Sequence, residues 1–346
     1  MFKIGIIVNP FSGKDLRRIS SQASNVGNNE KAIKVVRMIN SMKVFGAEKI
    51  YLMPDNFLLN ASIVSTVRRE DKLDTAVELL DFEPTDRPGD TIRAVKLMKN
   101  LEISCLIVLG GDGTCRLVAK TEIDVPIIPV STGTNNVYTQ FWEGTTVGIA
   151  ASYVAINGID ECSRKSKRIE VYINGVLRDI ALVDAVVTDV PYVGSKVVTE
   201  PENIKEVIVS MCSPASVGFS AIIGNIAYCS ENDDFGYRLR VSEEGKTILA
   251  PICPGKLSEI TYEDHERMEL GSEHICLPNY DGTVALDGER TVTFRKDDKL
   301  SFVITRKGPC KVDVTKTLCE AVEKGFFIVT GHDYGQIQTV NTEFPE

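Results

Sequence analysis

Short apolar runs alternate with helical patterns through the first half of the chain. The apolar runs have the length of strands and lie at residues 3–8, 49–53, 105–109 and 126–130. Runs of this kind are typical of parallel strands that are buried on both faces. The segments between them repeat apolar residues at helical spacing, at residues 30–45, 90–101 and 147–157. This alternation predicts a doubly wound, Rossmann-like α/β domain over residues 1–160.

The pattern changes near Cys162, after which β-branched and alternating segments dominate. Strands are predicted at residues 168–173, 176–187, 205–212, 247–250, 291–295 and 300–306. Asn174-Gly175 lies between the first two and predicts a two-residue hairpin turn. We therefore expect a β-sandwich domain over residues 161–315. The helical pattern at 317–324 predicts that residues 316–346 form a helix and tail, which we expect to pack back on the first domain.

Composition narrows the class of protein. The 346 residues suit two domains, and a net charge of −9 argues against nucleic-acid binding and against stable association with anionic membranes. No apolar stretch has the length of a membrane span, and the chain enters a strand directly from Met1. The nine cysteines are scattered without a CxxC pair, as expected in a reducing compartment. We predict a cytoplasmic protein whose partners are small molecules.

Three loops rich in glycine and polar residues each follow a predicted strand of the first domain. They are residues 9–14 (NPFSGK), 110–114 (GGDGT) and 131–136 (STGTNN). Because parallel strands end at one edge of a sheet, we expect the three loops to meet there. Together they offer backbone N–H groups, hydroxyls and one lysine, which are suited to holding a polyphosphate.

Asp112 stands out among these residues because it is a carboxylate at the mouth of an anion-binding turn. It would repel a phosphate, so it is expected to accept a proton or to face a metal ion. The alternative is a solvated aspartate in a tight turn. The loop at 9–14 is not a P-loop, which requires GxxxxGK[ST], and no GxGxxG follows a strand.

The combination of motifs resembles the NAD kinase and diacylglycerol kinase superfamily, and within it the ATP-NAD kinase-like AcoX proteins. The resemblance covers nearly the whole chain. Its matching segments are residues 9–14, 110–114, 131–137, 213–220 and 287–289.

The resemblance implies a nucleotide-binding α/β domain, a β-sandwich and a site between them. It also implies an ATP-dependent phosphotransferase that uses Mg²⁺ and a hydroxyl acceptor, with Asp112 as the base or as the residue that orients it. The residues it assigns to ATP and its phosphates are Asn9, Ser12, Gly13, Lys14, Gly110, Gly111, Gly113, Thr114, Arg116, Thr132, Gly133, Thr134 and Asn135. The family further suggests a homodimer or homotetramer.

The acceptor side departs from the family pattern. NAD kinases carry an Asn-Glu pair where this chain has Val183-Asp184. By resemblance, Asn136, Asp184 and Ser213 would contact the acceptor. Asp287-Gly288-Glu289 is similar to a motif of the lipid kinases, so Glu289 would join Asp112 in catalysis, and Asp287 with Glu289 would hold Mg²⁺; the alternative is a hairpin turn.

The leading hypothesis is phosphorylation of NAD, giving NADP, or of a related nucleotide. A lipid kinase and a nucleotide-binding protein without kinase turnover are the alternatives.

Overall fold

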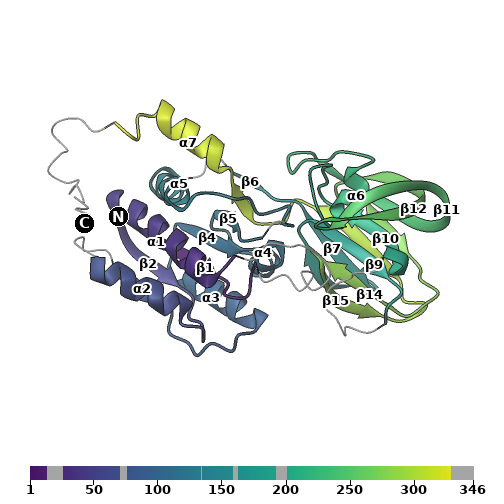
Figure 1. The fold of residues 1–346 in the computed structure, drawn as a ribbon, viewed down its shortest axis with the longest axis horizontal. Coiled ribbons are helices and arrows are strands. Elements are labelled where there is room, and N and C mark those ends of the chain that lie inside the picture. Colours follow the sequence, from purple (N-terminus) through teal and green to yellow (C-terminus); the bar gives the residue numbers. More distant parts are fainter. Residues whose placement is uncertain (14–25, 71–75, 134, 159–162, 192–200, 329–346) are drawn as a thin grey trace.

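The computed structural model describes the chain except residues 14–25, 71–75, 134, 159–162, 192–200 and 329–346. An α/β part contains both the N-terminus and the helices α1 to α5, and a β-rich part lies at the opposite end of the long axis (Figure 1). Helix α4 lies on the side of the α/β part that faces the β-rich part. Among the described helices, none combines the length and apolar character needed to cross a bilayer.

A seven-stranded sheet forms the centre of the α/β part, in the order β3-β2-β1-β4-β5-β17-β6. The first five strands of this order are parallel. The strand bounds are β1 Phe2–Val8, β2 Ala47–Leu52, β3 Ala76–Leu79, β4 Cys105–Gly110, β5 Ile127–Ser131, β6 Ser163–Lys165 and β17 Cys310–Val312. The order 3-2-1-4-5 is that of a doubly wound sheet, which confirms the predicted fold of this part.

Helices cover both faces of this sheet because the strands bury apolar side chains on both faces. In β4, Ile107 and Leu109 pack toward α1, α2 and α5, whereas Leu106 and Val108 pack toward α3 and α4. The helix bounds are α1 Asn28–Val44, α2 Leu59–Glu70, α3 Pro88–Asn100, α4 Asp112–Ala119 and α5 Gly144–Asn157. The apolar runs of the sequence therefore correspond to strands that need two covering layers.

Two antiparallel sheets form the β-rich part, as predicted. One has the order β12-β11-β10-β9-β14-β15 and the other β13-β16-β7-β8. The bounds are β7 Arg168–Ile173, β8 Val176–Ala181, β9 Asp184–Thr188, β10 Ile204–Val209, β11 Phe235–Cys253, β12 Lys256–Glu269, β13 Glu273–Cys276, β14 Gly282–Leu286, β15 Glu289–Phe294 and β16 Leu300–Thr305. Short helices are the 3-10 turn η2, Pro201–Asn203, and α6, Ser220–Gly224.

A shared apolar core holds the two antiparallel sheets together. Val171 and Phe302 of one sheet pack with Val187 and Val284 of the other. The predicted hairpin at Asn174-Gly175 is confirmed: both residues have positive φ, and Ile173 pairs with Val176. The interpretation of residues 247–250 as a short strand was incomplete, because β11 and β12 form one long hairpin that reaches the far end of the β-rich part (Figure 1).

The second half of the chain also contributes to the α/β part. Strand β17 pairs with β5 in parallel and with β6 in antiparallel orientation, so both extend the first sheet. Helix α7, Val314–Glu323, then packs on α5. The predicted limits at residues 160 and 315 remain a prediction.

Candidate functional site

The loops after β1 and β4 lie at the point where the strand order of the parallel sheet reverses. Strand β1 has β2 on one side and β4 on the other, and β4 leads on to β5. Chain connections leave in opposite directions at such a point and open a crevice at the carboxyl ends of the strands, where ligands of doubly wound folds bind. The loops after β1, β4 and β5 are the three that we predicted to meet.

Direct contacts join these three loops, which confirms that they meet. The Asn9 amide donates to Thr114 Oγ1 at 3.0 Å, and the Thr132 N–H donates to the Gly110 carbonyl at 3.2 Å. Gly13 has a φ of +74°, and a Cβ there would lie 2.5 Å from the Thr132 carbonyl oxygen. Glycine is therefore needed at residue 13, both for its backbone conformation and for the close approach of the third loop.

Lys31 of α1 holds the backbone of the first loop. No sequence pattern marked it as a site residue. The side chain is 1% exposed, and its ammonium donates to the carbonyl oxygens of Asn9, Pro10 and Ser12 at 3.0, 3.2 and 2.6 Å. It also donates to Asn28 Oδ1 at 3.2 Å. A buried ammonium that gathers carbonyl groups sets the peptide orientation of the loop.

Asn136 ties the third loop to the start of α4. Its Oδ1 accepts the Asp112 N–H at 3.3 Å, and its amide donates to Ser131 Oγ at 2.8 Å and to the Gly133 carbonyl at 3.2 Å. A Cβ on Gly111 would lie 2.9 Å from Asn136 Oδ1. Asn136 thus positions the first turn of α4 by accepting one of its N–H groups. Its predicted contact with the phosphate acceptor stays a prediction.

The carboxylate of Asp112 is turned onto the backbone of the third loop. It accepts N–H groups from Val137 at 2.7 Å, Tyr138 at 3.1 Å and Thr139 at 3.0 Å. The side chain is buried. Burial raises the pKa of Asp112, while the three N–H groups and the charge of Lys311 oppose that shift. Because an ionised carboxylate has about four acceptor positions, one remains for a further donor.

Arg116, one turn further along α4, joins the α/β part to the β-rich part. Its guanidinium lies 3.3 Å from Asp179 of β8 and 3.8 Å from Asp287 in the turn between β14 and β15. Lys120 reaches the same Asp179 at 2.9 Å. Arg116 is 4% exposed, so it is a buried junction residue here. Its predicted role toward phosphate stays a prediction.

The side chain of Asp287 is completely buried and holds the crossover between β8 and β9. Its carboxylate accepts N–H groups from Leu182 at 3.0 Å, Val183 at 2.8 Å and Asp184 at 3.3 Å. Burial raises the pKa of Asp287 to about 7, even though Arg116 and the backbone N–H groups favour its charged form. The negative charge of Asp112 also raises it, which places the two carboxyl groups in one electrostatic neighbourhood.

The predicted acceptor residues lie on the β-rich side of this junction. Asp184 begins β9 and is buried. Its N–H donates to the Asp287 carboxylate, and its carbonyl accepts the Asp287 N–H at 3.0 Å. Ser213 follows β10, and its Oγ accepts the Ala215 N–H at 3.2 Å. Leu182 and Val183 share an apolar cluster with residues of α3 and α4. The crossover at 182–184 is therefore packed directly against the α/β part.

Some predicted site residues are not placed. Lys14 and Thr134 lie outside the described residues, and the side chain of Glu289 is not described, although its backbone begins β15. Among the described residues, no three His, Cys, Asp or Glu side chains cluster as a metal site. Asp287 directs its carboxylate to backbone N–H groups, and its predicted role toward Mg²⁺ with Glu289 stays a prediction.

A second lysine supports the third loop from β17 of the same sheet. Lys311 of β17 donates to the Tyr138 carbonyl at 2.9 Å and to Glu231 at 2.5 Å, and its ammonium lies 4.8 Å from the centre of the Tyr138 ring. Neither Lys31 nor Lys311 belongs to a glycine motif, and each is far in sequence from the loop it supports. An isolated lysine on a helical or strand pattern gives no local signal of such a role.

The chain is similar to known proteins over most of its length. Residues 4–157 match the ATP-NAD kinase N-terminal domain, and residues 167–307 match the acetoin catabolism protein X C-terminal domain. Acetoin catabolism protein X of Cupriavidus necator is 32% identical over 330 residues, which is 92% of each chain. A solved structure of a putative diacylglycerol kinase from Bacillus anthracis str. Sterne aligns with a TM-score of 0.46 and 12% identity, over 90% of this chain and 97% of the other. The protein is a member of the acetoin catabolism protein X family, with an ATP-NAD kinase-like N-terminal domain.

Proposed function

We propose that the protein is an ATP-dependent kinase that transfers the γ-phosphate of ATP to a hydroxyl group of NAD or a related nucleotide. The observation that carries this proposal is the meeting of three strand-end loops at the switch point of the parallel sheet, in the segment that matches an ATP-NAD kinase domain. Phosphoryl transfer depends mostly on positioning and on stabilisation of charge, and rigid loops with backbone N–H groups provide both.

The donor phosphates are proposed to bind at the loop residues 9–14, 110–114 and 131–135, beside the first turn of α4. The residues present suit this group, because the α4 N-terminus favours negative charge, and Gly13 and Gly111 let the three loops approach one another closely. Lys31 and Asn136 would hold these loops in place before the nucleotide arrives. Bound ATP would supply the phosphoryl group.

Asp112 is proposed to accept the proton of the attacking hydroxyl. Three of its acceptor positions are occupied by backbone N–H groups, and the remaining one could take a hydroxyl donor. Arg116 and Asp287 would fix the crossover at 182–184, beside which an acceptor would bind. Participation of Glu289 and of Mg²⁺ belongs to the proposal as expected from the family.

A specific observation favours a second candidate, nucleotide binding without phosphoryl transfer. The carboxylates of Asp112 and Asp287 both act as acceptors for backbone N–H groups within the protein. Such carboxylates are suited to holding loops in place. A protein with this arrangement could bind ATP and change shape or partner without turning it over.

One experiment separates these functions. The purified protein is incubated with ATP and Mg²⁺ and, in turn, NAD, NADH, nucleosides, sugars and diacylglycerol, and products are identified by mass. Formation of NADP supports the proposal, and product with diacylglycerol alone would replace it by a lipid kinase. Nucleotide binding without product from any acceptor supports the second candidate.

The Asp112→Asn variant tests the role of the carboxylate, with Asp90→Asn as the matched control. Asp90 is also a buried carboxylate in the first turn of a helix, where it accepts the Thr85 N–H and hydroxyl at 2.7 and 2.8 Å. If Asp112 is the base, turnover falls by at least about 10² in Asp112→Asn, and the acidic limb of the pH–rate profile disappears. Equal losses in the two variants would contradict a role as base.

A further inference from the structure

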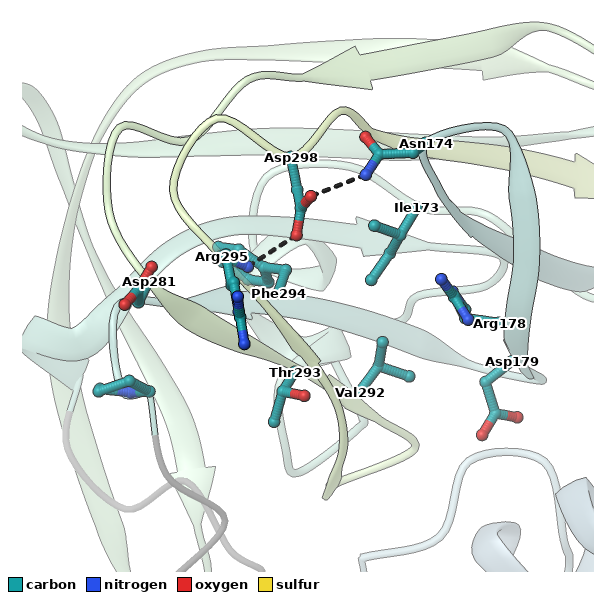
Figure 2. A pocket seen from close by; sticks show the side chains of 11 residues that line it. Ile173, Asn174, Arg178, Asp179, Asp281, Val292, Thr293, Phe294, Arg295 and Asp298 are labelled. Atoms are coloured by element: carbon teal, nitrogen blue, oxygen red, sulfur yellow. Dashed lines mark hydrogen bonds between the residues drawn. The ribbon is translucent and has the colours of Figure 1, made fainter.

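A pocket in the β-rich part lies away from the three strand-end loops. It encloses about 760 Å³ between the β7–β8 hairpin on one side and β15 with the following turn on the other (Figure 2). The size lies within the range of small-molecule sites. Ile173, Val292 and Phe294 provide apolar lining, and Asn174 and Thr293 provide polar groups. Charged side chains contribute as well, and most of the lining surface is polar.

Two arginines line the pocket from opposite sides. Arg178 comes from β8 and Arg295 from the end of β15, and Figure 2 shows their side chains on either side of Thr293 and Val292. Both residues are exposed to solvent. Within the described part of the chain, neither guanidinium lies within 4.0 Å of a carboxylate oxygen. In a chain with a net charge of −9, two arginines in one pocket without such an ion pair are notable.

The carboxylates of the pocket already have other partners. Asp179 pairs with Arg116 and Lys120. Asp298 accepts the Arg295 N–H at 2.8 Å and the Asn174 amide at 2.7 Å. Asp281 accepts the Lys296 N–H at 2.7 Å.

Both arginines lower the pKa of the same carboxyl group, that of Asp298. The Arg295 N–H is the main cause that lowers the pKa of Asp298, and the charges of Arg295 and Arg178 add to that effect. The Asp298 side chain accepts its hydrogen bonds from the turn and from Asn174, and the guanidinium donors of both arginines remain available to a further group.

We propose that this pocket binds a small organic anion whose carboxylate or phosphate group is held by Arg178 and Arg295 and whose apolar body rests on Ile173, Val292 and Phe294. Guanidinium groups suit planar or tetrahedral oxyanions because they donate two parallel hydrogen bonds. The site is separate from the loops proposed to bind ATP. It adjoins the first domain through Asp179, whose partner Arg116 belongs to α4 and whose partner Lys120 directly follows this helix.

The test measures binding of defined anions and locates it. Acetate, butyrate, inorganic phosphate and glycerol 3-phosphate are titrated calorimetrically into the full-length protein, and hydrogen–deuterium exchange identifies the protected peptides. We expect protection at residues 173–179 and 292–298. Preference for butyrate over acetate would identify a carboxylic acid with an apolar body, and preference for glycerol 3-phosphate would identify a phosphate ester.

Variants connect the binding to the two arginines. Arg178→Ala and Arg295→Ala are each expected to weaken binding by at least 10-fold, and Arg295→Lys by less, because lysine keeps the charge without the paired donors. Arg69→Ala, an exposed arginine on α2, is the matched control and should leave the affinity unchanged. The proposal is overturned if the double variant binds within two-fold of the wild type, if protection is confined to residues 9–13 and 110–114, or if none of the four anions binds.

Discussion

Replacing Lys31 by methionine tests whether a buried ammonium organises the first phosphate loop. Methionine has a similar length and fits an apolar site, but it cannot donate a hydrogen bond. The substitution removes four contacts of 2.6 to 3.2 Å, three of them to consecutive or near-consecutive carbonyl groups of the loop. The side chain is 1% exposed, so water does not readily replace the ammonium as a donor to these carbonyl groups.

The expected magnitude follows from these contacts. Each hydrogen bond to a charged group contributes about 1.5–3 kcal/mol net, but removal of the buried charge and hydration of the loop carbonyls offset part of the loss. We therefore expect the free energy of unfolding to fall by about 3 kcal/mol, the net of one or two such bonds. Binding of ATP must then order about two loop residues, at about 1–2 kcal/mol each or about 2–4 kcal/mol in all, which weakens affinity by about 30-fold or more.

Chemical denaturation measures the first quantity, and calorimetric titration with ATP measures the second. Lys34→Met on the same helix is the matched control, because Lys34 is half-buried and has no hydrogen bond to the loop. The reasoning is refuted if Lys31→Met binds ATP within three-fold of the wild type while Lys34→Met does the same. A loss of stability without a loss of affinity would show that Lys31 supports the fold but not the loop conformation that binds.

Three further predictions test other contacts of the site. Gly13→Ala adds a Cβ 2.5 Å from the Thr132 carbonyl at a φ of +74° and should destabilise the protein by about 2–3 kcal/mol, measured by urea unfolding. Asp287→Asn tests the pKa of about 7. Because a raised pKa means that the folded state keeps the carboxyl proton, the stability of the wild type should fall relative to the variant as pH rises from about 4 to 7, by up to about 1.4 kcal/mol per pH unit. Parallel stability–pH curves for the two proteins would contradict this. Arg116→Leu leaves the buried Asp287 without its guanidinium and Asp179 with Lys120 alone, and should lower the free energy of unfolding by about 3 kcal/mol, whereas an unchanged melting temperature would exclude an energetic role at the junction.

Local patterns predicted the parallel sheet and its three loops well. The strands at 3–8 and 105–109 are continuous apolar runs because both faces are covered, and that requirement is visible in the sequence itself. The Asn174-Gly175 turn was equally readable, since few dipeptides adopt two successive positive φ angles.

The long β11–β12 hairpin was not predicted because its pattern is dominated by exposed charged residues. Its middle, from Ser242 to Lys246, carries mostly exposed or half-exposed side chains, so period-two alternation of apolar residues is interrupted there. Pairing with β12 across this interruption, at Lys246 and Tyr262, is what continues the strand. Such pairing between segments is not contained in a local window of sequence.

The site was predicted at the level of its loops but not of its supports. Glycine and Asp112 mark the loops by residue type, whereas Lys31, Lys311 and the orientation of the Asp112 carboxylate depend on distant segments that come together only in the fold. The sequence pattern predicted that Asp112 faces the hydroxyl that receives the phosphate, and it gave no sign that the carboxylate also accepts three backbone N–H groups. That sharing depends on the path of residues 137–139.

The strand β17 has a consequence for how the chain is made. The first sheet has its β5 edge at Ile127–Ser131, but the strand that covers this edge begins only at Cys310. At a synthesis rate of ~5–20 residues per second, the edge waits on the order of ten seconds or more for its partner. During that interval the emerging α/β part presents an open strand, which is a template for wrong pairing. Completion of the first sheet is therefore one of the last events of biosynthesis. A chain truncated before residue 310 would keep the bridge between Val130 and Gln140 but would lack the strand that pairs with Ile127.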